Sequence, residues 1–131
     1  MKRGRLEPPS PAAAMASESA PRAEDLIARF QLRPHPEGGW YREWQRSSLT
    51  VTRQDGATRS GLTTILFLLE GPQPSRWHRV SGADEAWIFL DGAALELLCL
   101  PPAGGASERR LLNAPLRDPA ADPIAVVPAG W

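Results

Sequence analysis

The chain contains two histidines, and the segment around one of them is the clearest candidate for chemistry. His78 lies in Ser75-Arg-Trp-His-Arg-Val80, and six residues separate it from Glu85. If residues 76–80 are extended, a turn at Gly82 would bring His78 and Glu85 to one surface. An imidazole beside a carboxylate can act as a base with its orienting acid, or the two can bind a metal ion. The same spacing also fits an ordinary half-exposed histidine paired with a nearby acid.

A second group of polar residues surrounds a pair of glycines, Gly38-Gly39. Two prolines restrict the backbone around His35, and the glycines let the chain turn or approach another backbone closely. The candidate ligand-binding residues here are His35, Glu37, Tyr41 and Arg42. They could hydrogen bond a polar ligand, although the same residue types suit the edge of an ordinary strand.

Arginine and tryptophan side chains supply further candidates for ligand binding. Arg46, Arg76 and Arg79 carry planar guanidinium forks, which suit a phosphate or a carboxylate. Arginine also provides nearly all of the positive charge in this chain, so its presence reflects composition as well. Trp87 could stack on a sugar, but large aromatic residues in a small barrel more often pack in the core.

One helix is expected near the start of the chain. Residues 19–30 carry its signature: Ser19 or Pro21 can open it, and two acidic residues lie in the first turn. The helix should end near Gln31, before Pro34. Residues 1–21 are rich in Ala, Pro and Ser and are expected to be a disordered tail.

After the helix, the hydrophobic pattern predicts short strands. Residues 40–46 alternate, which places Trp40, Arg42, Trp44 and Arg46 on one side. Residues 63–69 are continuously apolar or β-branched, which predicts a strand buried on both faces. Residues 85–90 and 93–100 flank Asp91-Gly92, a strong signal for a hairpin between them. Residues 124–127 form a last short strand, so the domain at 22–131 is expected to be all-β.

Composition excludes several classes of protein. The chain has 131 residues and a formal net charge of zero, so it lacks the basic excess that nucleic-acid binding requires. Its longest uninterrupted stretch of apolar or threonine residues, 62–69, is far shorter than a membrane span. Its one cysteine, Cys99, lies among leucines and is expected to be buried, which fits a reducing compartment and a cytoplasmic location.

Four motifs occur in an order that resembles a known family. They are His35-Pro-Glu-Gly-Gly-Trp-Tyr-Arg-Glu43, Ser75-Arg-Trp-His-Arg-Val80, Asp84-Glu-Ala-Trp87 and Val127-Pro-Ala-Gly-Trp131. Together they are similar to the fifth cupin family, a group often labelled predicted sugar epimerases. The resemblance implies a cupin jelly-roll barrel with one short N-terminal helix, and a homodimer. It brings no settled activity.

The general cupin motifs are only partly present. Glu85 and Gly92 match the spacing of the first motif, but Arg76 stands where its first histidine belongs. The second motif is matched by Pro128-Ala-Gly130, and its histidine is absent. A site of three histidines and one glutamate is therefore not expected, and His78 with Glu85 could form only a weaker metal site. Members of the family normally continue beyond this point, so the final strands of the barrel are expected to be missing.

These observations leave several functions open. The leading hypothesis is a cupin that binds a small polar ligand, such as a sugar or sugar nucleotide, and acts as an epimerase or isomerase. His78 would be its base, oriented by Asp84 or Glu85, and Tyr41 would return the proton. The alternatives are a non-catalytic small-molecule-binding cupin and an inactive shortened chain. The candidate cofactor is a divalent metal ion. A metal-dependent oxygenase ranks last among the functions, because the chain offers few metal ligands.

Overall fold

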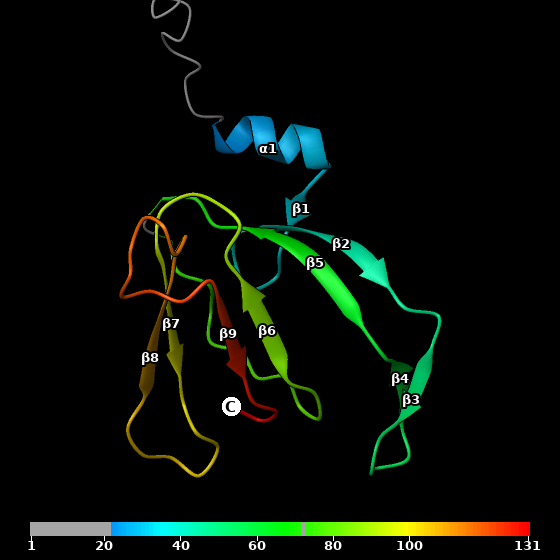
Figure 1. Ribbon diagram of the computed structural model, residues 1–131. Coiled ribbons are helices and arrows are strands. Elements are labelled where there is room, and N and C mark those ends of the chain that lie inside the picture. The colour runs from blue at the N-terminus through cyan, green and yellow to red at the C-terminus, as the bar shows by residue number, and fades with distance from the viewer. Residues whose placement is uncertain (1–21, 72) are drawn as a thin grey trace, which may run out of the picture. The chain divides into compact units, whose positions relative to one another are not determined.

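The computed structural model describes residues 22–71 and 73–131, and the predicted tail lies outside this range (Figure 1). The described residues contain one helix and nine strands in two compact units. Unit 1 comprises the residues up to Arg46 together with Thr63–Pro74, and unit 2 comprises Ser47–Leu62 and Ser75–Trp131. No helix in the described part is long and apolar enough to cross a membrane.

Unit 1 begins with the predicted helix, α1 (Ala23–Phe30). Its first turn is capped by Asp25, whose carboxylate accepts a hydrogen bond of 3.0 Å from the backbone N–H of Arg22. It ends where expected, because Gln31 takes a left-handed conformation with φ of 53°. The predicted start at Ser19 or Pro21 lies outside the described residues.

The helix is followed by a three-stranded antiparallel sheet, β1 (Arg33–Pro34), β2 (Trp40–Arg46) and β5 (Thr63–Leu68), with β2 in the centre. Gly39, at the entry to β2, has a φ of +73°, and a Cβ there would overlap the carbonyl of Leu68. Only glycine meets both conditions without strain.

A β-bulge in β2 overturns part of the predicted alternation. Glu43 lies opposite Ile65, but Gln45 lies opposite Thr64, so one extra residue is inserted at Trp44. Side chains beyond a bulge change sides, which places Arg46 on the side of Glu43 rather than of Arg42. The two side chains accordingly form an ion pair.

The prediction that β5 is buried on both faces is wrong. Its side chains alternate between exposed and half-buried at its start, and Ile65 is 44% exposed. A continuous apolar run is typical of strands covered on both sides, but β5 is an antiparallel strand with one more exposed face.

Unit 2 consists of three antiparallel strand pairs. They are β3 (Thr50–Thr52) with β4 (Thr58–Ser60), β6 (Glu85–Ile88) with β9 (Ile124–Val127), and β7 (Leu95–Cys99) with β8 (Glu108–Leu112). A parallel bridge between Leu112 and Asp122 follows β8. The most buried apolar side chains of the described residues lie in this unit: Cys99, Leu112, Ala121 and Ala125. The expected burial of Cys99 is confirmed.

The predicted hairpin at Asp91-Gly92 is wrong. β6 pairs with β9 and β7 pairs with β8, so the two strands that flank Asp91-Gly92 have different partners. The Asp91 carboxylate accepts a hydrogen bond from the Gly92 N–H, and Gly92 has a φ of 105°, so the chain does turn here. A turn signal shows where the chain can reverse, but distant strands decide the pairing.

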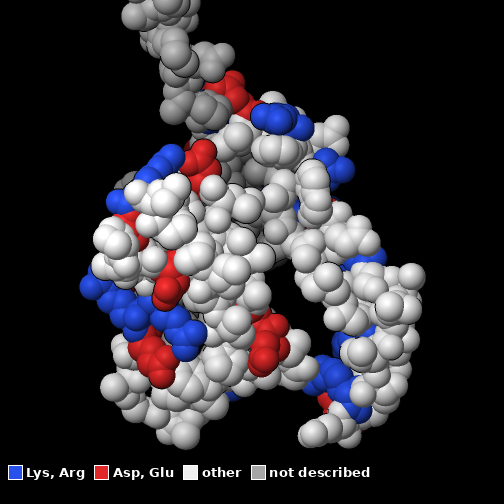
Figure 2. Space-filling view, viewed as in Figure 1, with Lys and Arg blue, Asp and Glu red and all other residues white. Residues whose placement is uncertain are grey.

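Acidic and basic side chains are interleaved on the β7–β8 hairpin (Figure 2). Arg109 pairs with Glu96 across the two strands at 2.7 Å, and Arg110 pairs with Glu108 along β8 at 2.9 Å. Each of these arginines has its pKa raised, first of all by the hydrogen bond to its carboxylate. This mixed surface agrees with the neutral net charge and offers no basic patch for a polyanion.

Candidate functional site

The structure brings His78 and Glu85 together, as predicted. The Nδ1 atom of His78 lies 3.1 Å from the backbone oxygen of Arg76, and Nε2 lies 3.5 Å from Oε2 of Glu85. A carbonyl oxygen can only accept, so Nδ1 carries a hydrogen and donates it. The Nε2 atom is therefore the one that faces the carboxylate. Both side chains are partly accessible, which allows a ligand to reach them.

Glu85 is the first residue of β6, and the strand sets its direction. Glu85, Trp87 and Phe89 are half-buried, whereas Ala86, Ile88 and Leu90 are exposed, so the side chains of this strand alternate between two faces. Trp87 lies opposite the small, buried Ala125 of β9. The carboxylate and the indole therefore belong to the same face of the β6–β9 pair.

The structure separates the roles of the two neighbouring acids. Asp84 accepts a hydrogen bond of 2.9 Å from the backbone N–H of Ala129, whereas Glu85 faces His78. Of the two candidates, Glu85 is thus the acid that can act on the imidazole. The group that orients the imidazole through Nδ1 is the backbone carbonyl of Arg76. The sequence had predicted a carboxylate in this role.

The segment that follows β9 holds the loop between His78 and Glu85. The N–H of Gly130 donates to the backbone oxygen of Val80 at 2.8 Å, and Ala129 binds Asp84 as described. The Pro128-Ala-Gly130 segment, considered above only as half of a metal motif, therefore fixes the loop that carries the site. In the sequence, the proline and the glycine just after the last strand were the available signal that this segment has a structural role.

A metal ion fits this site poorly. His78 Nε2 and Glu85 Oε2 converge, and the Nδ1 hydrogen bond to a carbonyl is the usual second contact of a histidine ligand. Yet within residues 22–71 and 73–131, no three His, Cys, Asp or Glu side chains form a group that could hold a metal. Two ligands do not build the three- or four-ligand sites typical of zinc and related metals.

In unit 1, His35, Glu37 and Tyr41 form a second cluster. The His35 ring meets Tyr41 edge-on with centroids 4.6 Å apart, and Phe67 at 5.3 Å. Its Nδ1 accepts a hydrogen bond of 3.2 Å from the N–H of Glu37, so the ring hydrogen resides on Nε2. The Glu37 carboxylate lies 3.9 Å from the same nitrogen. The three side chains therefore lie close together, and their role in binding stays a prediction.

The structure gives two predicted ligand-binding arginines other partners. Arg42 donates to the backbone oxygen of Phe30 at 3.1 Å, which satisfies a carbonyl at the end of α1. Arg46 binds both carboxylate oxygens of Glu43, at 3.0 and 2.6 Å. The hydrogen bond from Arg46 lowers the pKa of Glu43. A ligand at either arginine would have to share it with these groups, whereas Arg76 is exposed.

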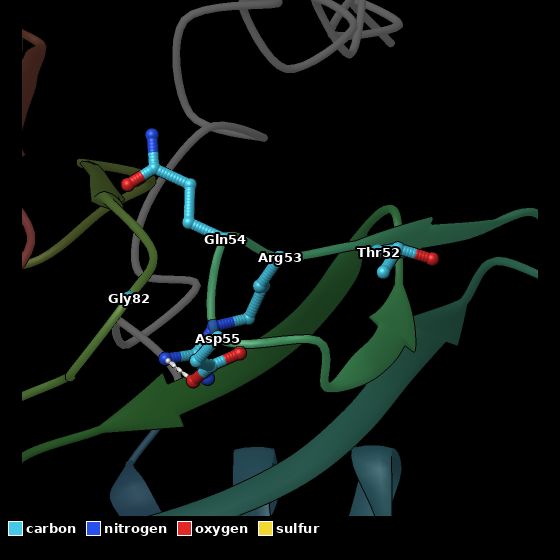
Figure 3. A pocket seen from close by; sticks show the side chains of 5 residues that line it. All are labelled: Thr52, Arg53, Gln54, Asp55 and Gly82. Carbon is cyan, nitrogen blue, oxygen red and sulfur yellow. Dashed lines mark ion pairs between the residues drawn. The ribbon is translucent and has the colours of Figure 1, made fainter.

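Sequence analysis did not find one further cluster in unit 2. Arg53 and Asp55 lie on the turn between β3 and β4, and their side chains form an ion pair of 2.9 Å (Figure 3). Together with Thr52, Gln54 and Gly82 they line a shallow pocket of about 460 Å³. Asp55-Gly56 between β-branched residues was the signal for this hairpin. Nothing local in the sequence indicates that Arg53 meets Gly82.

Comparison with known proteins identifies the class of this fold. Solved structures that match it include a hypothetical protein from Leishmania major, with a TM-score of 0.74 and 34% identity, and a protein from Shewanella oneidensis, with 0.70 and 32%. Each match covers 82% of this chain, and the chain spans 65% and 64% of those two proteins, respectively. These neighbours and the strand-rich architecture define a jelly-roll-like, all-β cupin fold, in which the described strands form no closed barrel.

A family model described as "Cupin superfamily (DUF985)" matches residues 24–131, and the chain belongs to this family. The resemblance inferred from the four motifs is thereby confirmed. A search of curated proteins found no match.

Proposed function

We propose that this cupin domain binds a small polar ligand at the face that carries His78 and Glu85, and that His78 transfers a proton there. The observation that carries the proposal is the arrangement of the His78 ring. Nδ1 donates to the Arg76 carbonyl, and Nε2 faces a carboxylate 3.5 Å away. A carboxylate this close to Nε2 stabilises the imidazolium that forms when this nitrogen takes a proton.

The chemistry best suited to this arrangement is epimerisation or isomerisation next to a carbonyl group. Nε2 takes the proton from carbon, and the electron pair of the C–H bond passes to the carbonyl oxygen as an enolate. The imidazolium that forms is stabilised by Glu85 on one nitrogen and by the Arg76 carbonyl on the other. Reprotonation on the opposite face completes the reaction.

The ligand we propose is a keto-sugar or a sugar nucleotide. Trp87, on the same strand face as Glu85, offers an apolar surface for a sugar ring. Arg76 is exposed two residues before His78 and can bind a phosphate or the enolate oxygen. We also propose that the protein acts as a homodimer, because a row of large apolar side chains on the opposite face of β6 and β9 is exposed. A cytoplasmic location is proposed as well.

Deuterium exchange tests the proposal directly. The 131-residue chain is incubated in D₂O with free keto-sugar phosphates and with nucleoside-diphosphate keto-sugars. Loss of the ¹H signal on the carbon next to the carbonyl is then followed by NMR. The variant His78→Asn keeps an amide that can donate to the Arg76 carbonyl but removes Nε2. We expect it to slow exchange by about 10²- to 10⁴-fold, and Arg109→Ala, on the β7–β8 hairpin, to exchange like the wild type.

Two results would overturn the proposal. Exchange that His78→Asn leaves unchanged would show that another group is the base. Binding of a sugar, detected by tryptophan fluorescence, without any exchange by the wild type would identify a non-catalytic binding protein.

A further inference from the structure

The guanidinium of Arg53 lies against the backbone of Gly82, the turn residue between His78 and Glu85. Gly82 has a φ of +78°, and a Cβ at this position would overlap the guanidinium atoms. The Arg53 side chain is only 26% exposed, although its residue lies in a hairpin turn. A side chain held this closely against a glycine leaves the glycine little room to move.

Arg53 is itself held in place by the turn from which it extends. Its N–H donates to Ala57 at 3.0 Å, and its carbonyl accepts from Gly56 at 2.9 Å. Asp55 binds twice: Oδ1 accepts from the N–H of Ala57 at 3.0 Å, and Oδ2 pairs with the Arg53 guanidinium. The hairpin between β3 and β4 is therefore a rigid support, and Asp55 orients the guanidinium toward Gly82 (Figure 3).

The contact with Arg53 completes a set of three that holds the His78–Glu85 loop. Val80 accepts from Gly130, Asp84 accepts from Ala129, and Gly82, midway between them, is covered by Arg53. Without Arg53, the two hydrogen bonds would still hold the ends of the loop, but its middle would lose this contact. The separation of His78 and Glu85 depends on the path of this loop.

We propose that Arg53 is a positioning residue, which sets the geometry of His78 and Glu85 by fixing the turn at Gly82. It does not touch the substrate and acts only through the loop. The inference rests on the proposed function for its catalytic consequence, but its structural part can be measured separately. Displacement of a catalytic group by about 1 Å can cost a factor on the order of 100 in rate.

The structural part is tested by long-range ¹H–¹⁵N NMR of the uniformly labelled 131-residue chain. Only two imidazoles contribute, and His78→Asn assigns them. We expect Arg53→Ala to shift the Nδ1 and Nε2 resonances of His78 and to leave those of His35, in unit 1, unchanged. The matched control is Arg59→Ala on β4 of the same hairpin, which should leave both rings as in the wild type.

The catalytic part uses the deuterium-exchange assay with the same variants. We expect Arg53→Ala to lower kcat at least 10-fold and to change KM less than 2-fold. Arg53→Lys, which can still pair with Asp55, should restore part of the rate and of the His78 signals. Asp55→Asn should resemble a milder Arg53→Ala and serves as the second variant if Arg53→Ala does not fold.

His78 resonances that stay at their wild-type positions in folded Arg53→Ala, or in Asp55→Asn, would overturn the positioning role. A rise in KM with kcat unchanged would also overturn it, because it would indicate that Arg53 binds substrate. Absence of exchange in the wild type would refute only the proposed function, since the NMR result still decides whether Arg53 sets the geometry of His78.

Discussion

At the scale of single residues, the ion pair between Glu43 and Arg46 shows how a backbone irregularity decides side-chain chemistry. In a regular strand these two residues would point to opposite faces. The bulge at Trp44 brings them to one face, and Arg46 then binds both oxygens of Glu43. The guanidinium that looked available for a ligand is instead occupied by a neighbour on its own strand.

The pKa of Glu43 should therefore depend on Arg46. We expect Arg46→Ala to raise it toward the ordinary value, because the hydrogen bond from Arg46 is the main cause of its lowering. Arg33→Ala should raise it less, since Arg33 acts only through its more distant charge. Carboxyl ¹³C NMR titration measures both.

A carboxyl with a lowered pKa stabilises the fold above its unfolded pKa, and this stabilisation is lost as the pH falls through the folded pKa. Arg46→Ala should thus weaken that acid dependence, and an unchanged Glu43 titration would contradict the role of the pair.

Residue chemistry was predictable where it depended on near neighbours. His78 and Glu85 are separated by six residues, and a glycine between them was enough to predict that they meet. The choice between Asp84 and Glu85 was not predictable, because it depends on the amide of Ala129, 45 residues after Asp84. Arg53 was missed for the same reason: its contact with Gly82 exists only in the folded chain.

At the scale of elements, α1 ends at a residue whose left-handed backbone conformation is unfavourable for a residue with a Cβ. Gln31 is the one non-glycine residue in the described chain with a positive φ. We expect Gln31→Gly to raise the free energy of unfolding by about 0.5–1 kcal/mol, because glycine adopts this conformation without a Cβ clash. Urea denaturation followed by circular dichroism measures the change. Gln45→Gly, in β2, should lower stability instead, and a loss of stability in Gln31→Gly would show that its side chain matters more than its backbone.

The bounds of strands with a clear hydrophobic period were predicted well, but the strands with which they pair were not. The bounds of β2 and β9 agree with the alternating and β-branched runs that predicted them. The pairing of β6 with β9 rather than with β7 depends on where a distant strand packs, which a local turn signal does not contain. Strand β8 was not predicted from the sequence, because the charged Glu108-Arg-Arg before its two leucines interrupts the apolar pattern expected of a strand.

At the scale of the whole molecule, apolar surface is distributed unevenly. Few apolar side chains of the described residues are fully buried, while Ile88 and Leu90 are 61% and 73% exposed. Ile88 lies opposite Ile124, which is also exposed, so the side chains form one row across β6 and β9. A row of this kind on a sheet face is typical of an interface, and a second copy of the chain is the partner proposed above.

The homodimer is tested by light scattering coupled to size-exclusion chromatography. We expect the wild-type chain to elute with the mass of a dimer and Ile88→Glu with that of a monomer, because a buried charge without a partner disfavours association. Leu116→Glu is the matched control, since Leu116 is fully exposed and lies in a loop outside β6 and β9. A monomeric wild type, or a dimeric Ile88→Glu, would contradict the proposed interface.

The hydrogen bonds from Ala129 and Gly130 also set an order of events during synthesis. Synthesis proceeds from the N-terminus, so His78 and Glu85 are translated before the residues whose amides bind Val80 and Asp84. Until those residues emerge, β6 lacks its partner β9 as well. The loop that carries the imidazole and the carboxylate can therefore take its final form only after residues 129 and 130 have been translated.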